Sequence, residues 1–163
     1  MLFRFVNQGF AATSADVVLI MNPDVRVTSD LAPLIAAGRE HGVAGGRLTD
    51  DQGRAQAGFT IRRFPTSTVL ALELLGVNRL WRGNPWNREY RYLDRDLTKG
   101  GAADQPAGAF LMVRRDVWST LGGMDEGFCP IWFEDVDFCR RADRKSTRLN
   151  SSHTDISRMP SSA

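Results

Sequence analysis

A run of five apolar residues between polar neighbours constrains the fold of this chain more than any other feature. Val17 to Met21 follows Asp16 and leads directly into Asn22-Pro23-Asp24. An apolar run without alternation is typical of a strand that is buried on both faces, as in a parallel sheet. The run therefore predicts an α/β fold in which Asp24 leaves a strand at the edge of the sheet where ligands bind.

The periodicity of the remaining chain predicts further strands and helices around this strand. Thr28-Ser29-Asp30 supplies helix-capping side chains before apolar residues that are spaced for one helix face. We expect that helix over 31–42, a further helix over 116–121, strands over 43–48, 59–64 and 106–115, and a turn over 50–53.

Two segments in the middle of the chain depart from simple patterns. A second helix carries Val69 to Leu75, whose apolar positions are dense enough to imply contact with something besides one sheet. Between residues 79 and 103 the periodicity disappears, and tryptophans and tyrosines alternate with arginines. A long loop of this composition inside a compact domain is usually functional, and its aromatic residues argue against plain disorder.

Composition indicates a single globular domain. The chain is 42% hydrophobic and 25% charged. Its longest apolar stretch is far too short to cross a bilayer, and its first residues do not resemble a signal peptide, so we expect a cytoplasmic location. Cys129 and Cys139 fit no zinc spacing and are expected to be free thiols.

The last 20 residues differ from the rest in composition. Residues 144–163 are rich in serine and contain neither an apolar period nor an aromatic residue. We interpret them as a disordered tail of foreign, read-through sequence that follows a domain over residues 1–143. The tail also carries the basic excess, and without it acidic residues slightly outnumber basic ones. The charge therefore gives no argument for nucleic-acid binding.

A cluster of acids near the end of the domain is the first candidate for an active site. Glu134, Asp135 and Asp137 lie between Trp132-Phe133 and Phe138-Cys139. Acids at a helix N-terminus interact favourably with the helix dipole, which accounts for one or two of them on a solvated face. Their placement among large apolar residues favours a functional role, with Asp137 as the structural member, and a carboxylate held there could serve as a general base.

Two other polar segments have both a structural and a functional interpretation. Asn22-Pro23-Asp24 is a common turn sequence, yet its place after a buried strand suits a carboxylate that binds a divalent ion on a diphosphate. Gly122-Gly123 could simply supply positive φ angles, or the turn could carry Asp125 and Glu126 to the acceptor side of a cleft.

Five short motifs, taken in order, resemble family 2 glycosyltransferases of the bacterial rhamnosyltransferase-like branch. The motifs are Asn22-Pro23-Asp24, Arg63-Phe64-Pro65-Thr66, Gly108 to Arg115, Gly122 to Glu126 and Phe133 to Cys139. Each motif alone is weak, and their order and spacing make the signal specific. The resemblance implies an incomplete GT-A fold, which is a nucleotide-diphospho-sugar transferase fold with a Rossmann-like sheet and flanking helices.

The resemblance also implies a catalytic base and a donor site. Asp135 matches the family's catalytic base, and Glu134 lies beside it as a supporting residue. Asp24 matches the last residue of the family's metal motif and would bind Mg²⁺ or Mn²⁺. Asn22 occupies the position where other members have the first acid, and with Asn7 it is expected on the donor side.

On the acceptor side the resemblance implies a second group of residues. Asp125 and Glu126 belong to the glycine-containing turn, Gly108 begins the motif before the predicted strand, and Trp132 precedes the acid cluster. These four residues are the expected contacts of the acceptor sugar.

The implied reaction is inverting transfer of a sugar, rhamnose in this branch, from a nucleotide-diphosphate sugar to a hydroxyl group. The acceptor would be lipid-linked or a polysaccharide in cell-envelope glycan synthesis, with peripheral contact of the enzyme at the inner face of the membrane. Complete members begin with strands that hold the nucleoside, so we expect this chain to be an internal fragment that lacks the N-terminal nucleotide-binding part.

Two alternatives to this reaction remain. The chain could be a non-catalytic, truncated piece of such an enzyme, with exposed strand edges. It could also be a metal-dependent phosphotransferase or nuclease that uses the same acids, although the chain has no glycine-rich phosphate loop of the usual kind.

Overall fold

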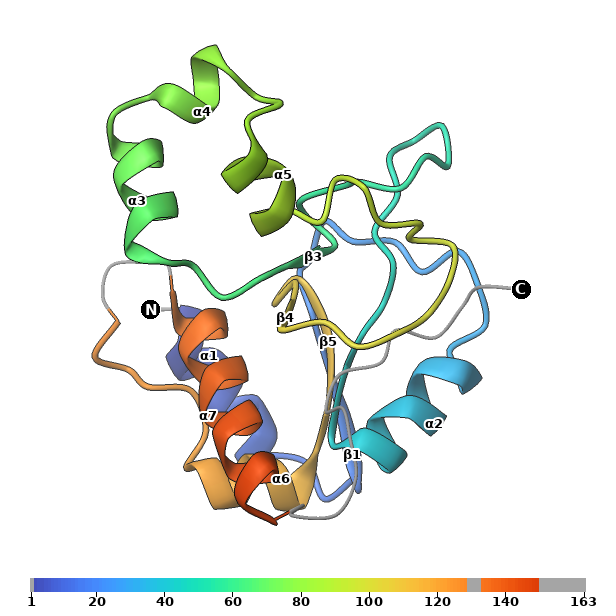
Figure 1. Ribbon diagram of the computed structural model, residues 1–163. Coiled ribbons are helices and arrows are strands. Elements are labelled where there is room, and N and C mark those ends of the chain that lie inside the picture. The colour runs from blue at the N-terminus through green and yellow to red at the C-terminus, as the bar shows by residue number, and fades with distance from the viewer. Residues whose placement is uncertain (1, 129–132, 150–163) are drawn as a thin grey trace.

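A three-stranded sheet lies at the centre of the structure, which is a computed structural model that describes residues 2–128 and 133–149 (Figure 1). Its strands, in spatial order, are β1 (Val17–Met21), β5 (Phe110–Arg114) and β2 (Val43–Gly45). Both outer strands pair antiparallel with β5, so that Val17 lies opposite Arg114 and Val43 lies opposite Val113. The mixed α/β class is confirmed.

The expectation of parallel neighbours for β1 is wrong. An unbroken apolar run reports that both faces of a strand are covered, and it does not report the direction of the adjacent strand. Here β5 returns through the sheet between β1 and β2, and it runs opposite to both. The Rossmann-like GT-A sheet that the resemblance implies stays a prediction.

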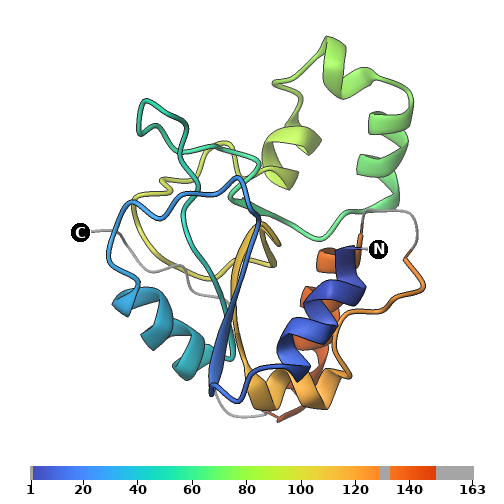
Figure 2. The ribbon, with the colours of Figure 1, turned by 180° about the vertical axis from the view of Figure 1, so that it is seen from behind.

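Helices cover both faces of the sheet, as the apolar run predicts. One face packs against α1 (Leu2–Ala11), α6 (Arg115–Leu121) and α7 (Glu134–Leu149), and the other packs against α2 (Ala32–His41) (Figures 1 and 2). Side chains of β5 alternate between the two layers, because Leu111 and Val113 join the first core and Phe110 and Met112 join the second.

The larger core is organised by stacked aromatic rings. Phe10 of α1 lies parallel to Trp118 of α6, with ring centroids 3.7 Å apart, and Phe138 of α7 packs against the same tryptophan at 5.2 Å. Helix α1 is an addition to the predicted elements. Because its Phe10 is almost fully buried, α1 belongs to the domain core.

A group of three short helices forms a lobe away from this sheet, as both views of the ribbon show (Figures 1 and 2). The lobe consists of α3 (Ser67–Leu74), α4 (Val77–Leu80) and α5 (Pro85–Tyr90), and we call residues 67–90 the α3–α5 lobe. It follows β3 (Ile61–Arg62), which pairs with β4 (Gln105–Pro106) in a second, two-stranded sheet. The expected loop from residue 79 therefore includes helix α5.

Several predicted boundaries shift by a few residues in the structure. The strands expected over 43–48, 59–64 and 106–115 are shorter, and the last of them is divided into β4 and β5. The turn over 50–53 is confirmed, since the Gly53 amide donates to the Asp50 carbonyl at 2.9 Å.

Helix α7 extends past the predicted end of the domain at residue 143. It runs to Leu149, and the division of the chain into a domain over 1–143 and a disordered tail stays a prediction. The Lys145 ammonium donates a hydrogen bond to the Thr120 carbonyl and fastens this extension to α6. Residues 150–163 lie outside the described residues, and the foreign origin of the tail stays a prediction.

Candidate functional site

The end of β1 and the entrance to β5 form one edge of the central sheet. The Asn22 amide donates to the Ala109 carbonyl at 2.9 Å, and the Val25 amide donates to the Asn22 carbonyl at 3.1 Å. Asn22-Pro23-Asp24 is therefore a turn, as its composition predicts, and it lies beside the segment that leads into β5. Asp24 is exposed there, and Asn22 is half-buried.

Asp135 reaches the same edge from α7. The Gly108 amide donates to Asp135 Oδ2 at 3.4 Å, which is the long end of the range for a hydrogen bond. A Cβ atom at position 108 would lie 3.0 Å from the Cβ of Asp135, closer than ordinary van der Waals contact. The absence of a side chain at Gly108 therefore lets the two segments meet, and a main-chain hydrogen bond aligns the carboxylate.

The start of α7 holds Asp135 through local backbone geometry. Asp135 Oδ1 accepts a hydrogen bond from the Val136 amide at 2.8 Å, and the Asp137 amide donates to the Phe133 carbonyl at 2.8 Å. Phe133 has a φ angle of +75°, which costs a non-glycine residue about 1–2 kcal/mol. Such strain occurs preferentially at functional sites, so it agrees with the interpretation of this helix start as a site.

Asp137 has the structural role that the sequence predicts. Its carboxylate accepts a hydrogen bond from Arg141 one turn later at 2.7 Å. The same guanidinium donates to the carbonyls of Leu121 at 2.7 Å and Gly123 at 3.0 Å. Arg141 thus connects α7 to the turn that begins at Gly122, and this pair fixes the helix rather than facing a substrate.

The glycine-containing turn presents Asp125 and Glu126 at the surface beside Arg141. Both acids are exposed, and Asp125 Oδ1 accepts a hydrogen bond from the Gly127 amide at 2.8 Å. Together with Asn7 and Arg141 they line an open pocket of about 480 Å³. The pocket gives these two carboxylates access to a ligand, and their acceptor role stays a prediction.

Both the nitrogen and the oxygen of the Asn7 side-chain amide form hydrogen bonds within the protein. Its Nδ2 donates to the Met124 carbonyl at 3.0 Å and to Glu126 Oε1 at 2.9 Å, and its Oδ1 accepts from the Met124 amide at 3.0 Å. These bonds give Asn7 a structural role, which is to hold the turn against α1. Donor binding by this residue stays a prediction.

The next turn of α7 connects the site to another of the sequence motifs. The Arg140 guanidinium lies 5.7 Å from the ring centre of Phe64, within the Arg63-Phe64-Pro65-Thr66 motif. One helical turn after Asp135, burial raises the pKa of the Cys139 thiol, and the negative charge of Asp135 raises it further. Cys139 therefore stays a neutral thiol and is not a nucleophile of this site.

The residues around Asp24 suit a divalent ion only if a substrate supplies most of its ligands. In the part of the chain that the structure describes, no three His, Cys, Asp or Glu side chains come together to hold a metal. Magnesium, however, commonly takes one or two carboxylates and completes its shell with water and phosphate oxygens. An exposed Asp24 at the sheet edge fits that mode, and the metal stays a prediction.

The structure assembles some of the predicted residues and leaves others apart. Asn22, Gly108 and Asp135 meet at one edge through the main chain, while Asn7, Asp125 and Glu126 form a second group around the turn. Glu134 is half-buried beside Asp135. Trp132 lies outside the described residues.

Sequence reasoning missed three buried asparagines in the α3–α5 lobe, Asn78, Asn84 and Asn87. One signal was available. Asn84 is followed by Pro85, and an asparagine N-cap followed by proline is a typical helix start.

Comparison with known proteins relates the chain to glycosyltransferases. It is 25% identical over 150 residues to the rhamnosyltransferase WbbL of Escherichia coli (strain K12), an alignment that covers 90% of this chain and 53% of that protein. The chain thus spans about half the length of this curated relative. At this identity the similarity supports a glycosyltransferase-like relationship. No protein-family model matches the chain, and no solved structure matches it.

Proposed function

We propose that this chain carries the catalytic and acceptor side of an inverting glycosyltransferase that adds a sugar, rhamnose by analogy with its relative, to a glycan or lipid-linked hydroxyl. The observation that carries the proposal is the meeting of Gly108 with Asp135 beside the end of β1. It brings a half-buried carboxylate to the sheet edge where Asn22 and Asp24 leave the strand.

Asp135 would serve as the general base. One carboxylate oxygen accepts the Val136 amide and the other accepts the Gly108 amide, so the group has a fixed orientation and retains lone pairs for a substrate proton. As the acceptor hydroxyl gives its proton to Asp135, its oxygen bonds to the anomeric carbon, and the bond from that carbon to the nucleoside diphosphate breaks. Glu134, on the same helix start, would orient the acceptor.

The donor would lie on the side of Asn22 and Asp24. A divalent ion bound there would neutralise charge on the departing diphosphate. The chain's own contribution is an exposed carboxylate and a half-buried amide at the edge of a covered sheet. Asp125 and Glu126 would bind acceptor hydroxyl groups from the pocket next to Arg141.

Replacement of Asp135 by Asn, in a form of the protein that shows transfer activity, tests the proposal. Asn keeps the shape of the side chain and loses the base, so we expect the rate of transfer to fall by about 10²–10⁴-fold. Asp51→Asn, in the exposed turn before Gly53, is a matched control and should transfer at the wild-type rate. Transfer by the Asp135 variant at a rate close to wild type would remove Asp135 as the base.

Calorimetric titration with UDP- and dTDP-sugars in the presence of manganese separates donor binding from chemistry. Saturable heat that is lost in Asp24→Ala would support a donor site at the sheet edge. No heat from a folded sample would instead support the non-catalytic alternative for this chain. A nuclease or phosphotransferase would hydrolyse or transfer phosphate without an acceptor sugar, and the same reactions can be assayed for those products.

A further inference from the structure

The α3–α5 lobe buries polar side chains and exposes apolar ones. Its fully or nearly fully buried side chains include Asn78, Asn84 and Asn87, whereas Val69 is the buried hydrophobic residue of α3. Leu74 and Leu80, by contrast, are 89% and 88% exposed. This distribution is the reverse of an ordinary helical unit, in which leucines face inward.

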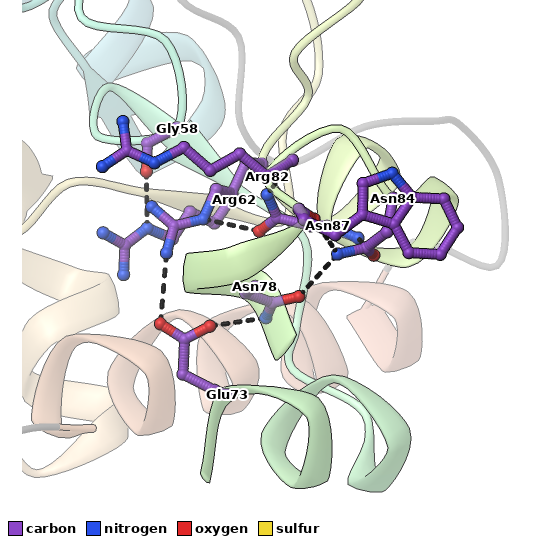
Figure 3. Close-up of polar contacts among 9 residues, drawn as sticks. Gly58, Arg62, Glu73, Asn78, Arg82, Asn84 and Asn87 are labelled. Atoms are coloured by element: carbon purple, nitrogen blue, oxygen red, sulfur yellow. Dashed lines mark hydrogen bonds and ion pairs between the residues drawn. The ribbon is translucent and has the colours of Figure 1, made fainter. Parts of the chain in front are cut away.

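A network of hydrogen bonds takes the place of an apolar core (Figure 3). Asn78 donates to Glu73 at 2.5 Å, and Asn84 donates to the Asn78 side chain at 2.9 Å. Asn84 Oδ1 also caps α5 by accepting the Asn87 amide at 2.8 Å. Arg91 closes the network, since it donates to Asn87 at 2.9 Å and to Glu73 at 3.3 Å. The lobe is therefore held in shape without its leucines.

The exposed apolar side chains lie on all three helices of the lobe. The exposed ones are Leu70, Leu74 and Leu75 at α3, Leu80 and Trp81 at the end of α4, and Trp86 in α5. Leu70 and Leu74 are one helical turn apart and share a face of α3. Single exposed leucines are common, but six exposed large apolar side chains within residues 70–86 are what an interaction surface would present.

Unpaired arginines flank the most exposed part of this surface. Arg79 and Arg82 stand on either side of Leu80-Trp81, and both are exposed. Within the described residues neither forms an ion pair, whereas Arg88 and Arg91 are paired with Asp94 and Glu73. The end of α4 thus presents a leucine and a tryptophan between two available positive charges.

We propose that the α3–α5 lobe binds the surface of an anionic lipid membrane through Leu74, Leu80 and Trp81, with Arg79 and Arg82 on the lipid headgroups. Interfacial segments combine these features, because leucine enters the acyl boundary, tryptophan prefers the headgroup level and arginine pairs with anionic lipid. The proposal is independent of the proposed transfer reaction. It would place any acceptor site at the edge of the central sheet near a membrane.

The charge is what favours a lipid surface over a second copy of the chain. Self-association through this surface would bring Arg79 and Arg82 of two copies close together, with no carboxylate in the exposed Arg79-Leu80-Trp81-Arg82 segment to neutralise them. No described helix is both long and apolar enough to cross a bilayer, so the contact would be made at the membrane surface.

Sedimentation with lipid vesicles tests the proposal without any donor or acceptor. The intact protein should sediment with vesicles of equal parts phosphatidylcholine and phosphatidylglycerol, and much less with phosphatidylcholine alone. Arg79→Gln with Arg82→Gln should weaken binding by roughly tenfold or more, and added salt should weaken it as well. Leu74→Ser with Leu80→Ser and Trp81→Ser should abolish binding. Phe5→Ser, which changes a side chain that is 65% exposed on α1, is the control and should bind as wild type.

A second readout identifies the bound residue. Brominated lipid should quench tryptophan fluorescence in wild type and quench it less in Trp81→Phe than in Trp86→Phe, because the buried Trp118 contributes equally to both variants. Circular dichroism must show that each variant is folded, which we expect because the changed side chains are exposed. Absence of binding to anionic vesicles, or binding that the triple substitution leaves unchanged, would overturn the proposal. So would self-association that the triple substitution removes, since a second copy would then be the occupant.

Discussion

The Cβ atom that Gly123 lacks would lie 2.8 Å from Oδ1 of Asn7. That oxygen accepts the Met124 amide at 3.0 Å, and Gly123 itself has a φ angle of +77°. The turn before Asp125 therefore requires glycine at this position both for its backbone conformation and for the approach of α1.

Gly123→Ala should destabilise the domain more than Gly122→Ala. Both glycines have positive φ angles, so each alanine costs about 1–2 kcal/mol of backbone strain. Position 122 has nothing within 4 Å of an added Cβ, whereas at 123 the methyl group would displace Asn7 and cost a further ~1–3 kcal/mol in lost hydrogen bonds. Urea unfolding of the two variants measures the difference. Equal losses would mean that Asn7 moves aside freely.

Gly108→Ala should lower the rate of the proposed transfer. The added methyl group would press on Asp135 Cβ at 3.0 Å and shift the carboxylate, and displacement of a reacting group by about 1 Å costs on the order of 10²-fold. Gly9→Ala on α1, where nothing lies within 4 Å, is the matched control and should leave transfer unchanged. Steady-state assays of both variants decide the matter, and an unchanged rate in Gly108→Ala would show that Asp135 tolerates movement.

Asn84→Ala should loosen the α3–α5 lobe. The side chain is fully buried. Its Nδ2 donates to the Asn78 side chain and to the Trp81 carbonyl, and its Oδ1 accepts a hydrogen bond from the Asn87 amide. Loss of the helix cap costs about 1 kcal/mol, and each partner left without a hydrogen bond adds ~1–3 kcal/mol. Hydrogen exchange of amides in residues 77–91 should accelerate, with smaller changes in β5. Thr66→Ala, which removes an exposed cap from α3, should produce the smaller, cap-sized effect. Equal exchange in the two variants would contradict a special role for the network.

The buried thiol of Cys139 should make stability fall at alkaline pH. Its pKa is raised in the folded protein, so the unfolded chain loses this proton first, from about pH 8.5 upward. The free energy of unfolding should then decrease by at most about 1.4 kcal/mol per pH unit from this group. Cys139→Ala removes the contribution, so the stability difference between wild type and variant should shrink as pH rises. A difference that is constant between about pH 7 and about pH 10 would contradict the prediction.

Local pattern was sufficient to predict the strands and not their directions. The apolar runs that became β1 and β5 predict strands with both faces covered, and both strands contact both cores, β5 with buried side chains and β1 with half-buried ones. Their antiparallel pairing depends on how the intervening chain returns, which periodicity does not encode. Helix α5 had a recognisable start at Asn84-Pro85, but the surrounding arginines and aromatic residues obscured any apolar period because the lobe exposes its apolar side chains.

The candidate site was predictable in its residue types and not in its contacts. An acid cluster between aromatic residues identified the start of α7, and the arginine at 141 confirmed Asp137 as structural. The contact of Asp135 with Gly108 joins residues 27 positions apart, and Asn7 reaches Met124 across 117 positions. Such pairs follow from tertiary packing, for which a single sequence carries no local signal.

The separation between bonded residues also sets an order of events during folding. In the asparagine network, Asn84 bonds partners that are 6 and 3 positions away, so the α3–α5 lobe can form from a short stretch of chain. The part of the chain around the central sheet, by contrast, forms only when β1 meets β5 and α1 meets the turn at Met124. These contacts close much longer loops, at a greater cost in chain entropy. The lobe should therefore acquire its shape early, before the sheet edge that holds Asp135 exists.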